Sequence, residues 1–202
     1  KIEYLVGGKN YENKNMLPYN SKVLDLIIDF SKELNLNKKT EKYPDIKTLA
    51  FFCRKANIYK LKERFVSNET RLGLGLVFHI TPSNIPTNFA YSLIFGLLTG
   101  NSNIVKVSSK KFEQIDLICD ALNRVLKKKK HNLFKKLITI IRYSDHKEIT
   151  KRISKICEAR LIWGGDETIK NIRSFSLKER AIDIPFADRY SFCVIDAEKI
   201  EK

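Results

Sequence analysis

The sequence predicts an α/β protein with a doubly wound, mostly parallel sheet behind a helical lead-in. Beyond about residue 71, short apolar, β-branched runs alternate with amphipathic helical windows, and such alternation is typical of parallel strands joined by crossover helices. The runs are continuously apolar, as expected for strands covered on both faces. The expected strands are 74–80, 103–107, 137–141, 159–163, 181–186 and 191–195, and the expected helices are 87–98, 112–126, 145–157 and 166–175.

The first 70 residues form a mainly helical segment in this interpretation. A short strand is expected at 2–6, followed by a helix over 21–34 whose apolar positions recur at helical spacing, with Ser21 as its N-cap. A second helix starts at Asp45 and extends toward residue 65. We therefore divide the chain into a helical segment, 1–70, and a dinucleotide-binding domain, 71–202. Ligands of such a domain bind at the carboxyl ends of its strands.

The composition excludes several classes of protein. The 202 residues are 43% apolar, a share too high for a disordered chain, and no apolar stretch approaches the ~20 residues of a membrane helix. The first residues lack the apolar core of a signal peptide. The four cysteines contain no CxxC pair, so we expect neither a disulfide framework nor a metal site. A cytoplasmic location is the resulting expectation.

The charge is strongly basic, with 38 Lys and Arg against 23 Asp and Glu, a formal charge of +15. This balance suits nucleic acid, an acidic membrane surface or an anionic cofactor. Lys, Asn and Ile are scattered throughout, which favours general compositional bias instead. The densest run, 127–130, lacks the interleaved aromatic residues of single-strand binders and is interpreted as a solvated helix end. Nucleic acid is thus an unlikely partner, and a basic nucleic-acid- or anion-binding module remains the alternative function.

The loop after the first strand, 79–86, reads HITPSNIP and replaces the glycine-rich GxGxxG turn of a standard dinucleotide fold. Two prolines bracket Ser83, Asn84 and Ile85. A rigid turn at a strand end can fix the Asn84 amide as a hydrogen-bond donor to an oxyanion. The alternative is a simple turn in which Asn84 caps the next helix and Pro86 is its first residue.

The next strand ends at Lys106, a cation in an otherwise apolar run, which usually requires an anionic or hydroxyl partner. Ser108, Ser109, Lys110 and Lys111 follow and would suit a phosphate group. The alternative is an edge lysine whose ammonium reaches solvent along its apolar stem.

A third loop places Trp163, Gly164 and Gly165 between a strand and a helix. The two glycines would let a ligand approach the backbone closely, and the helix N-terminus beyond them favours an anion. A tight turn with Asp166 as N-cap is the alternative. The fourth segment, 184–196, says little alone but adds its spacing to the other three.

Taken together, the segments NIP, NIVKVSS, WGGDETI and RYSFCVID resemble, in order and spacing, the LuxC-type acyl-CoA reductases. This family includes the fatty-acid reductase of bacterial bioluminescence and belongs to the aldehyde dehydrogenase superfamily. The resemblance covers residues 72–196. It implies the cofactor-binding fold of that superfamily. It also implies reduction of a fatty acyl thioester to an aldehyde by NADPH, through a cysteine thioester intermediate.

The resemblance also assigns roles to residues. Asn84 matches the oxyanion-hole asparagine, and Lys106 matches the lysine that binds the cofactor ribose. Ser109 stands where NAD-using relatives often carry a glutamate; with Lys110 beside it, the position would accept the 2′-phosphate of NADPH. Trp163, Gly164 and Gly165 match the diphosphate loop. The full set of cofactor candidates is His79, Thr81, Pro82, Ser83, Lys106, Ser108, Ser109, Lys110, Trp163, Gly164 and Gly165.

Two departures from the superfamily pattern stand out. Pro185 or Phe186 occupies the place of a glutamate base, which a reductase that releases aldehyde does not need. The nucleophilic cysteine of the family falls beyond the RYSFCVID stretch, so we expect a truncated chain that is inactive alone. The four cysteines are expected to be non-catalytic: Cys53, Cys119 and Cys157 in helices and Cys193 in a strand.

The histidines carry no catalytic pairing with a cysteine in this interpretation. His79 is expected at a strand end, packed there or next to the cofactor, and His131 and His146 in polar surroundings. Fatty acyl-CoA or another acyl thioester would be the substrate, met through the absent half, with a homo-oligomer or partner subunits left open. Another reaction of the same superfamily and an inert degenerate remnant remain the further alternatives.

Overall fold

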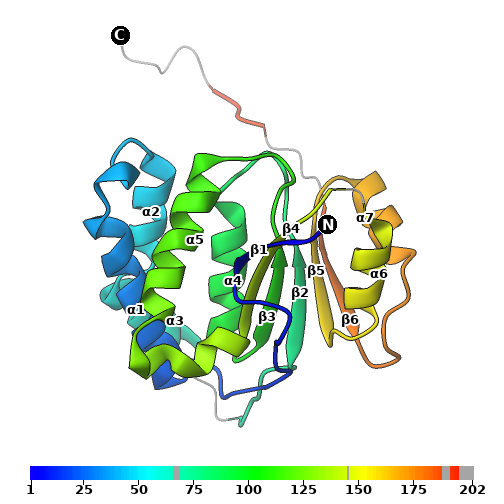
Figure 1. Cartoon of the computed structure of the whole chain (residues 1–202), viewed down its shortest axis with the longest axis horizontal. Helices are drawn as coiled ribbons and strands as arrows, with labels where there is room; N and C mark the ends of the chain where they lie inside the picture. Colours follow the sequence, from blue (N-terminus) through cyan, green and yellow to red (C-terminus); the bar gives the residue numbers. More distant parts are fainter. Residues whose placement is uncertain (66–68, 145, 188–191, 196–202) are drawn as a thin grey trace.

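A six-stranded sheet with helices on both faces organises the computed structural model, which describes residues 1–65, 69–144, 146–187 and 192–195 (Figure 1). The strand order is β1-β4-β3-β2-β5-β6. All neighbouring pairs are parallel except β1 with β4. The strands are β1 (Glu3–Val6), β2 (Leu76–Ile80), β3 (Ser102–Lys106), β4 (Ile138–Arg142), β5 (Ala159–Trp163) and β6 (Ile182–Phe186). The predicted doubly wound, mostly parallel sheet is confirmed.

Helices alternate with these strands and also form the lead-in. They are α1 (Ser21–Leu36), α2 (Pro44–Phe52), α3 (Lys55–Phe65), α4 (Asn88–Leu98), α5 (Glu113–Leu126), α6 (Lys147–Ser154) and α7 (Asp166–Arg173), with 3₁₀ turns η1 (Lys38–Thr40) and η2 (Lys129–Lys136). In the described part of the chain, none of these helices combines the length and apolarity needed to cross a membrane.

The strand order reverses beside β2. The chain moves from β2 to β3 and β4 in one direction, then returns to place β5 on the other side of β2. As a result α4 and α5 cover one face, whereas α6 and α7 cover the other (Figure 1). In such sheets the reversal opens a crevice at the carboxyl ends of the two central strands. The ends of β2 and β5 are therefore the candidate position for a site.

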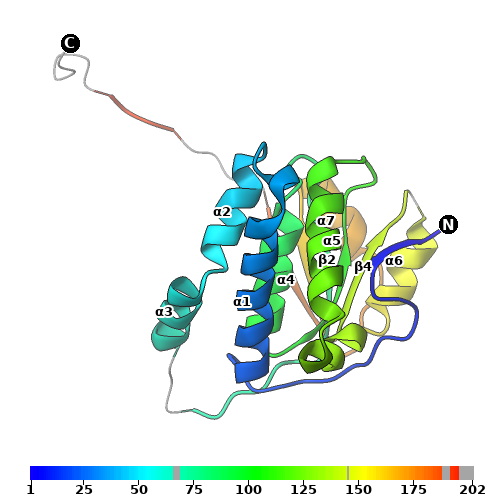
Figure 2. The same cartoon turned by 60° about the vertical axis from the view of Figure 1, so that its left-hand side comes forward.

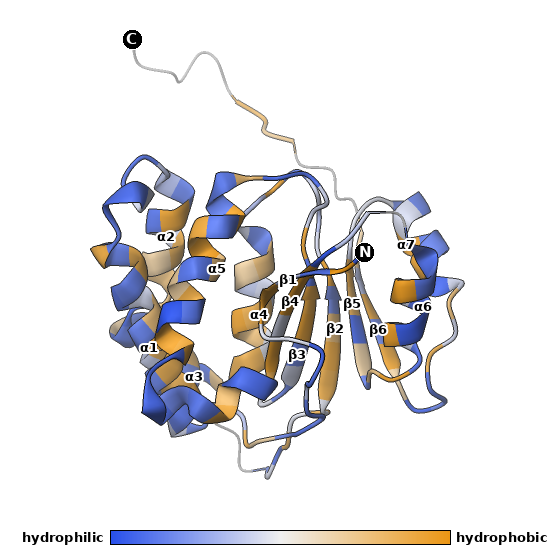
Figure 3. Cartoon of the chain, viewed as in Figure 1, coloured by the Kyte–Doolittle hydropathy of each residue, from blue (hydrophilic) through white to orange (hydrophobic). Residues whose placement is uncertain are grey.

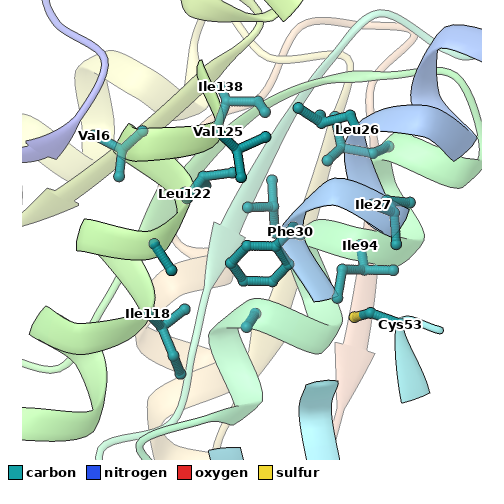
Figure 4. Packing of buried hydrophobic residues seen from close by; sticks show 14 of the residues in the cluster. Val6, Leu26, Ile27, Phe30, Cys53, Ile94, Ile118, Leu122, Val125 and Ile138 are labelled. Carbon is teal, nitrogen blue, oxygen red and sulfur yellow. The ribbon is translucent and has the colours of Figure 1, made fainter. Parts of the chain in front are cut away.

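The lead-in shares its core with the sheet. Phe30 of α1 packs among Ile94 of α4 and Ile118 and Leu122 of α5, in the same cluster as Ile138 of β4 (Figure 4). Figure 2 shows α1 running beside α5, with α2 and α3 farther out. Hydrophobic residues gather on the strands and on the inward helix faces (Figure 3). A domain boundary at residue 70 remains a prediction.

Three local expectations were wrong. Asn20, not Ser21, caps α1: its Oδ1 accepts the Lys22 backbone N–H at 3.0 Å, so Ser21 becomes the first helical residue. The helix predicted from Asp45 is interrupted, since α2 ends at Phe52.

The third wrong expectation concerns the predicted strand 191–195. Residues 192–195 belong to no strand, and Phe192 is 90% exposed; Ser191 lies outside the described residues. The strand that pairs with β5 is β6, not this run. Cys193 is accordingly exposed and not within a strand.

The lysine run after α5 contributes to the packing. Asp29 of α1 is buried and accepts from Lys130 at 2.8 Å, from His131 Nε2 at 2.9 Å and from Lys128 at 3.3 Å. Burial alone would raise the pKa of this carboxyl, but the three donors hold it well below its usual range. His131 is itself buried, with its Nε2 on the Asp29 carboxylate. Two of the four lysines in the run are thus tied to the fold.

A buried ion pair holds β6 against the sheet. Arg160 of β5 is fully buried and binds Asp183 through both carboxylate oxygens, at 2.7 and 2.9 Å. Its third nitrogen donates to Ser154 Oγ at 2.9 Å and to the Phe175 carbonyl at 3.2 Å. Every nitrogen of the guanidinium therefore has an acceptor, which is what a buried cation requires.

Replacing Asp183 with Asn should lower the free energy of unfolding by about 3–5 kcal/mol, because it leaves the buried Arg160 charge uncompensated. Urea denaturation measures this change. Glu12→Gln, which breaks the exposed pair with Lys136 at 2.9 Å, is the matched control and should cost less than about 1 kcal/mol. Equal losses in the two variants would contradict the stabilising role assigned to Asp183.

Candidate functional site

Strand register brings the predicted loops to one edge of the sheet. Ile80 of β2 lies opposite Lys106 of β3 on one side and Ile162 of β5 on the other, and Trp163 lies opposite Phe186 of β6. Since these strands are parallel, the chain leaves all of them at the same edge. The candidates Thr81, Lys106 and Trp163 are therefore brought together at the point where the strand order reverses.

The loop after β2 is tied to the end of β3. The Thr81 hydroxyl and backbone N–H both donate to the Lys106 carbonyl, at 2.9 and 3.2 Å. Beyond this anchor Ser83 and Asn84 are exposed, and Pro82 is half-buried. Thr87 is the N-cap of α4, so the alternative in which Asn84 caps the helix and Pro86 begins it was wrong. The exposed Asn84 amide is left at the turn.

Lys106 lies at the end of β3 with its ammonium 5.3 Å from the centre of the Tyr143 ring, a cation–π distance. Tyr143 is buried, its hydroxyl bonds with Thr150 Oγ1 at 2.8 Å, and burial raises its pKa to about 12. The ring thus gives the lysine a fixed, uncharged support at the sheet edge.

The residues after β3 form a short turn rich in donors. The Ser108 hydroxyl is buried and accepts the Lys110 backbone N–H at 3.1 Å, whereas the side chains of Ser109 and Lys110 are exposed. No acidic residue occurs from Lys106 to Lys111. Hydroxyl and cationic groups without a competing carboxylate are the donor set that a phosphate ester requires.

The turn after β5 is tight. Gly165 is the N-cap of α7, so the alternative in which Asp166 caps the helix was wrong. A Cβ on Gly164 would lie 3.1 Å from Thr168 Cγ2, closer than most real contacts, which explains a glycine there. Asp166 and Glu167 in the first turn stabilise the helix dipole but oppose an anion at this helix end.

Trp163 and Phe186 form a stacked pair at the edge, with ring centres 3.9 Å apart and planes at 5°. The Trp163 indole N–H donates to Ser92 Oγ of α4 at 3.3 Å. Pro185 and Phe186, which stand where a glutamate base was considered, are exposed at the end of β6. At position 186 the edge therefore presents an aromatic ring instead of a carboxylate.

His79 lies inside the fold, not at its surface. It is fully buried, with Nδ1 2.8 Å from Ser92 Oγ and Nε2 2.9 Å from Asn103 Oδ1. Burial lowers its pKa to about 4, against the opposing effect of the Asn103 hydrogen bond. Sequence reasoning missed Ser92 and Asn103. Ser92 is a polar residue inside an apolar run, whereas Asn103 only precedes one and gave a weaker signal.

The cysteines described in the structure do not form a catalytic pair with histidine. Cys53, Cys119 and Cys157 are buried, and burial raises the pKa of each thiol, that of Cys157 to about 11. Buried thiols of this kind are poor nucleophiles. Within the described residues, no three His, Cys, Asp or Glu side chains gather closely enough to hold a metal ion.

Comparison with known families decides the assignment. A model of the acyl-CoA reductases named LuxC matches residues 18–201. The chain belongs to this LuxC family. A search among curated proteins found no match to the chain.

Solved structures show the fold that this LuxC-family chain shares. A benzaldehyde dehydrogenase from Corynebacterium glutamicum superposes with a TM-score of 0.58 at 12% identity, over 81% of this chain and 41% of that one. An NADP-dependent glyceraldehyde-3-phosphate dehydrogenase from Bacillus halodurans, solved with NADP, gives 0.56 at 17% identity, over 82% and 40%. GapN from Methanocaldococcus jannaschii, also solved with NADP, gives 0.56 at 18%, over 80% and 40%.

These identities establish the fold alone, that of the aldehyde dehydrogenases. The LuxC-family chain spans about two-fifths of the length of the structures it matches.

Stability of the chain should fall as the pH drops from about 6.5 to about 4, partly through His79. Its pKa is depressed in the folded state, so the unfolded chain binds more protons in this window and acid favours unfolding. We expect His79 to account for about 2–3 kcal/mol between pH 7 and pH 4.5, measured by urea denaturation. His79→Gln, which cannot titrate, should lose that part of the dependence; unchanged pH dependence would contradict the assignment.

Proposed function

We propose that this chain is the NADPH-binding portion of an acyl-CoA reductase that converts a fatty acyl thioester to an aldehyde. The observation that supports this most directly is the cluster of Lys106, Ser108, Ser109 and Lys110 at the carboxyl edge of a doubly wound sheet, in a chain of the LuxC family. That edge is where dinucleotides bind in folds of this type.

The donor set fits a dinucleotide phosphate. In this proposal Lys106, held over Tyr143, binds a cofactor ribose hydroxyl, and Ser109 with Lys110 meets the 2′-phosphate. The Gly164–Gly165 turn lets the diphosphate approach the backbone, while the carboxylates of α7 weaken that contact. When bound, the cofactor supplies the hydride for the reduction.

The substrate side of the proposal rests on Asn84. Its exposed amide at the end of β2 would donate a hydrogen bond to the acyl oxygen, where negative charge develops during attack on the thioester. The Trp163–Phe186 pair would exclude water from the edge. Because Phe186 and Pro185 present no carboxylate there, acyl hydrolysis would gain no general base from these positions.

The nucleophile of this reaction is proposed to lie outside the 202 residues. The three buried thiols have raised pKa values, which leaves little thiolate at neutral pH. Unpaired cysteines suit a reducing compartment, so we propose the cytoplasm as the location.

NADPH should bind this chain saturably and more tightly than NADH, and the fluorescence of its single tryptophan, Trp163, should report both titrations. Lys106→Met should raise the dissociation constant of NADPH about tenfold or more, as loss of a charge-assisted hydrogen bond implies. Lys60→Met, at an exposed position of helix α3, is the matched control and should change nothing.

A variant of Ser109 tests the preference for NADPH over NADH. Ser109→Glu should weaken NADPH through repulsion of the 2′-phosphate and leave NADH largely unaffected, whereas Ser109→Ala should have a small effect on both. Equal affinities of the unaltered chain for both cofactors would contradict the NADPH assignment. Binding of nucleic acid that weakens steeply with salt, without cofactor binding, would support the basic-module alternative.

The purified chain should not oxidise NADPH when a long-chain acyl-CoA is added, because three of its cysteines are buried and the nucleophile is proposed to lie outside the chain. Absorbance at the NADPH band measures this directly. Turnover above the rate of a heat-denatured sample would contradict a nucleophile outside the chain. A Cys193→Ser variant would then show whether the exposed thiol carries the reaction.

A further inference from the structure

A chain of hydrogen bonds runs from the candidate site into the core. The Trp163 indole N–H meets Ser92 Oγ at 3.3 Å, Ser92 Oγ lies 2.8 Å from His79 Nδ1, and His79 Nε2 lies 2.9 Å from Asn103 Oδ1. Ser92, His79 and Asn103 are at most 2% exposed. Three buried polar residues, on α4, β2 and β3, are thus linked by hydrogen bonds to the indole ring at the end of β5.

The direction of every hydrogen bond in this chain is fixed by its two ends. The Trp163 nitrogen can only donate. At the other end, Asn103 Nδ2 donates to the Asn101 backbone carbonyl at 2.8 Å, which can only accept, so Asn103 Oδ1 faces His79. His79 must then carry its proton on Nε2. Its Nδ1 accepts from the Ser92 hydroxyl, which in turn accepts from Trp163.

The ring of His79 stays neutral in this arrangement. Ser92 and Asn103, which contact it from α4 and β3, are both uncharged, and its lowered pKa of about 4 leaves the imidazole unprotonated on Nδ1 at neutral pH. A neutral, single tautomer is what the directed chain requires.

Gly96 provides the space for this chain, one turn beyond Ser92 on α4. A Cβ at that position would lie 2.0 Å from Asn103 Oδ1 and 3.0 Å from His79 Cε1. The close approach of α4 to β2 and β3 therefore depends on a residue without a side chain. Helix α4, the Asn103 side chain of β3 and the His79 ring of β2 are in close contact at this point.

We propose that His79 is a positioning residue of the cofactor site, which acts through Ser92 to fix the indole of Trp163 at the end of β5. The contribution to cofactor binding rests on the function proposed above. Stacking on Phe186 holds the indole plane but is weakly directional, whereas the bond to Ser92 sets its rotation within that plane. The Gly164–Gly165 turn starts at this residue, so its entry angle depends on the same contact.

Ser92→Ala tests the proposal because it removes the link and little volume. We expect the near-ultraviolet circular dichroism of the indole to decrease, the far-ultraviolet spectrum to persist, and the dissociation constant of NADPH to rise about fivefold. Ser31→Ala is the matched control: Ser31 is another buried helix serine, and its hydroxyl donates to the Ala50 carbonyl at 2.6 Å. A purely structural role for Ser92 would lower the melting temperature without changing the Trp163 signal, and that result would overturn the proposal.

A second measurement needs no variant. Nitrogen-15 NMR of the unaltered chain at pH 7 should show His79 as the neutral tautomer protonated on Nε2; a proton on Nδ1 or an imidazolium would overturn the proposal, including where Ser92→Ala fails to fold. If the unaltered chain binds no NADPH, the proposed function fails on its own. The tautomer and the Trp163 spectrum then still decide the positioning role.

Discussion

Parallel pairing of strands covered on both faces is the constraint on which the rest of this molecule depends. Because β2 to β6 all point the same way, their carboxyl ends lie at one edge. Because both faces are covered by helices, polar groups on the strands must either leave at that edge or find partners inside. Lys106 lies at that edge, whereas His79 is buried and bonds with side chains inside the fold. The site and the buried network are two outcomes of one topology.

Much of this architecture could be predicted from the sequence, since continuous apolar runs and helical periodicity are local signals. The prediction for β5, 159–163, matches its bounds, and each of the other five strands in the structure begins and ends within two residues of its predicted bounds. The helix caps were harder to predict. Asn20 and Ser21 are both good capping residues, and only the backbone geometry decides between them. The apolar run 192–195 shows the converse limit, because an apolar pattern alone does not decide whether a segment pairs with a strand.

For the candidate site, the loop residues could be anticipated but the contacts that support them could not. Lys106 stands out as a cation ending an apolar strand, yet nothing in its spacing indicates Tyr143, the residue after β4 whose ring its ammonium approaches. Asp29 and His131 are separated by about a hundred positions and still share a buried hydrogen bond. Such pairs arise only when helices and strands pack, so no periodic pattern within one element records them.

The lack of a side chain at Gly96 limits the substitutions that this sequence can accept. Most helix positions tolerate alanine, and in an isolated helix the change from glycine would be favourable. Here the added methyl group would occupy the space of the Asn103 amide oxygen, so the preference of the helix and the needs of its neighbours conflict. A substitution at this position becomes acceptable only together with a smaller residue at 103, which couples two sites that lie on different elements.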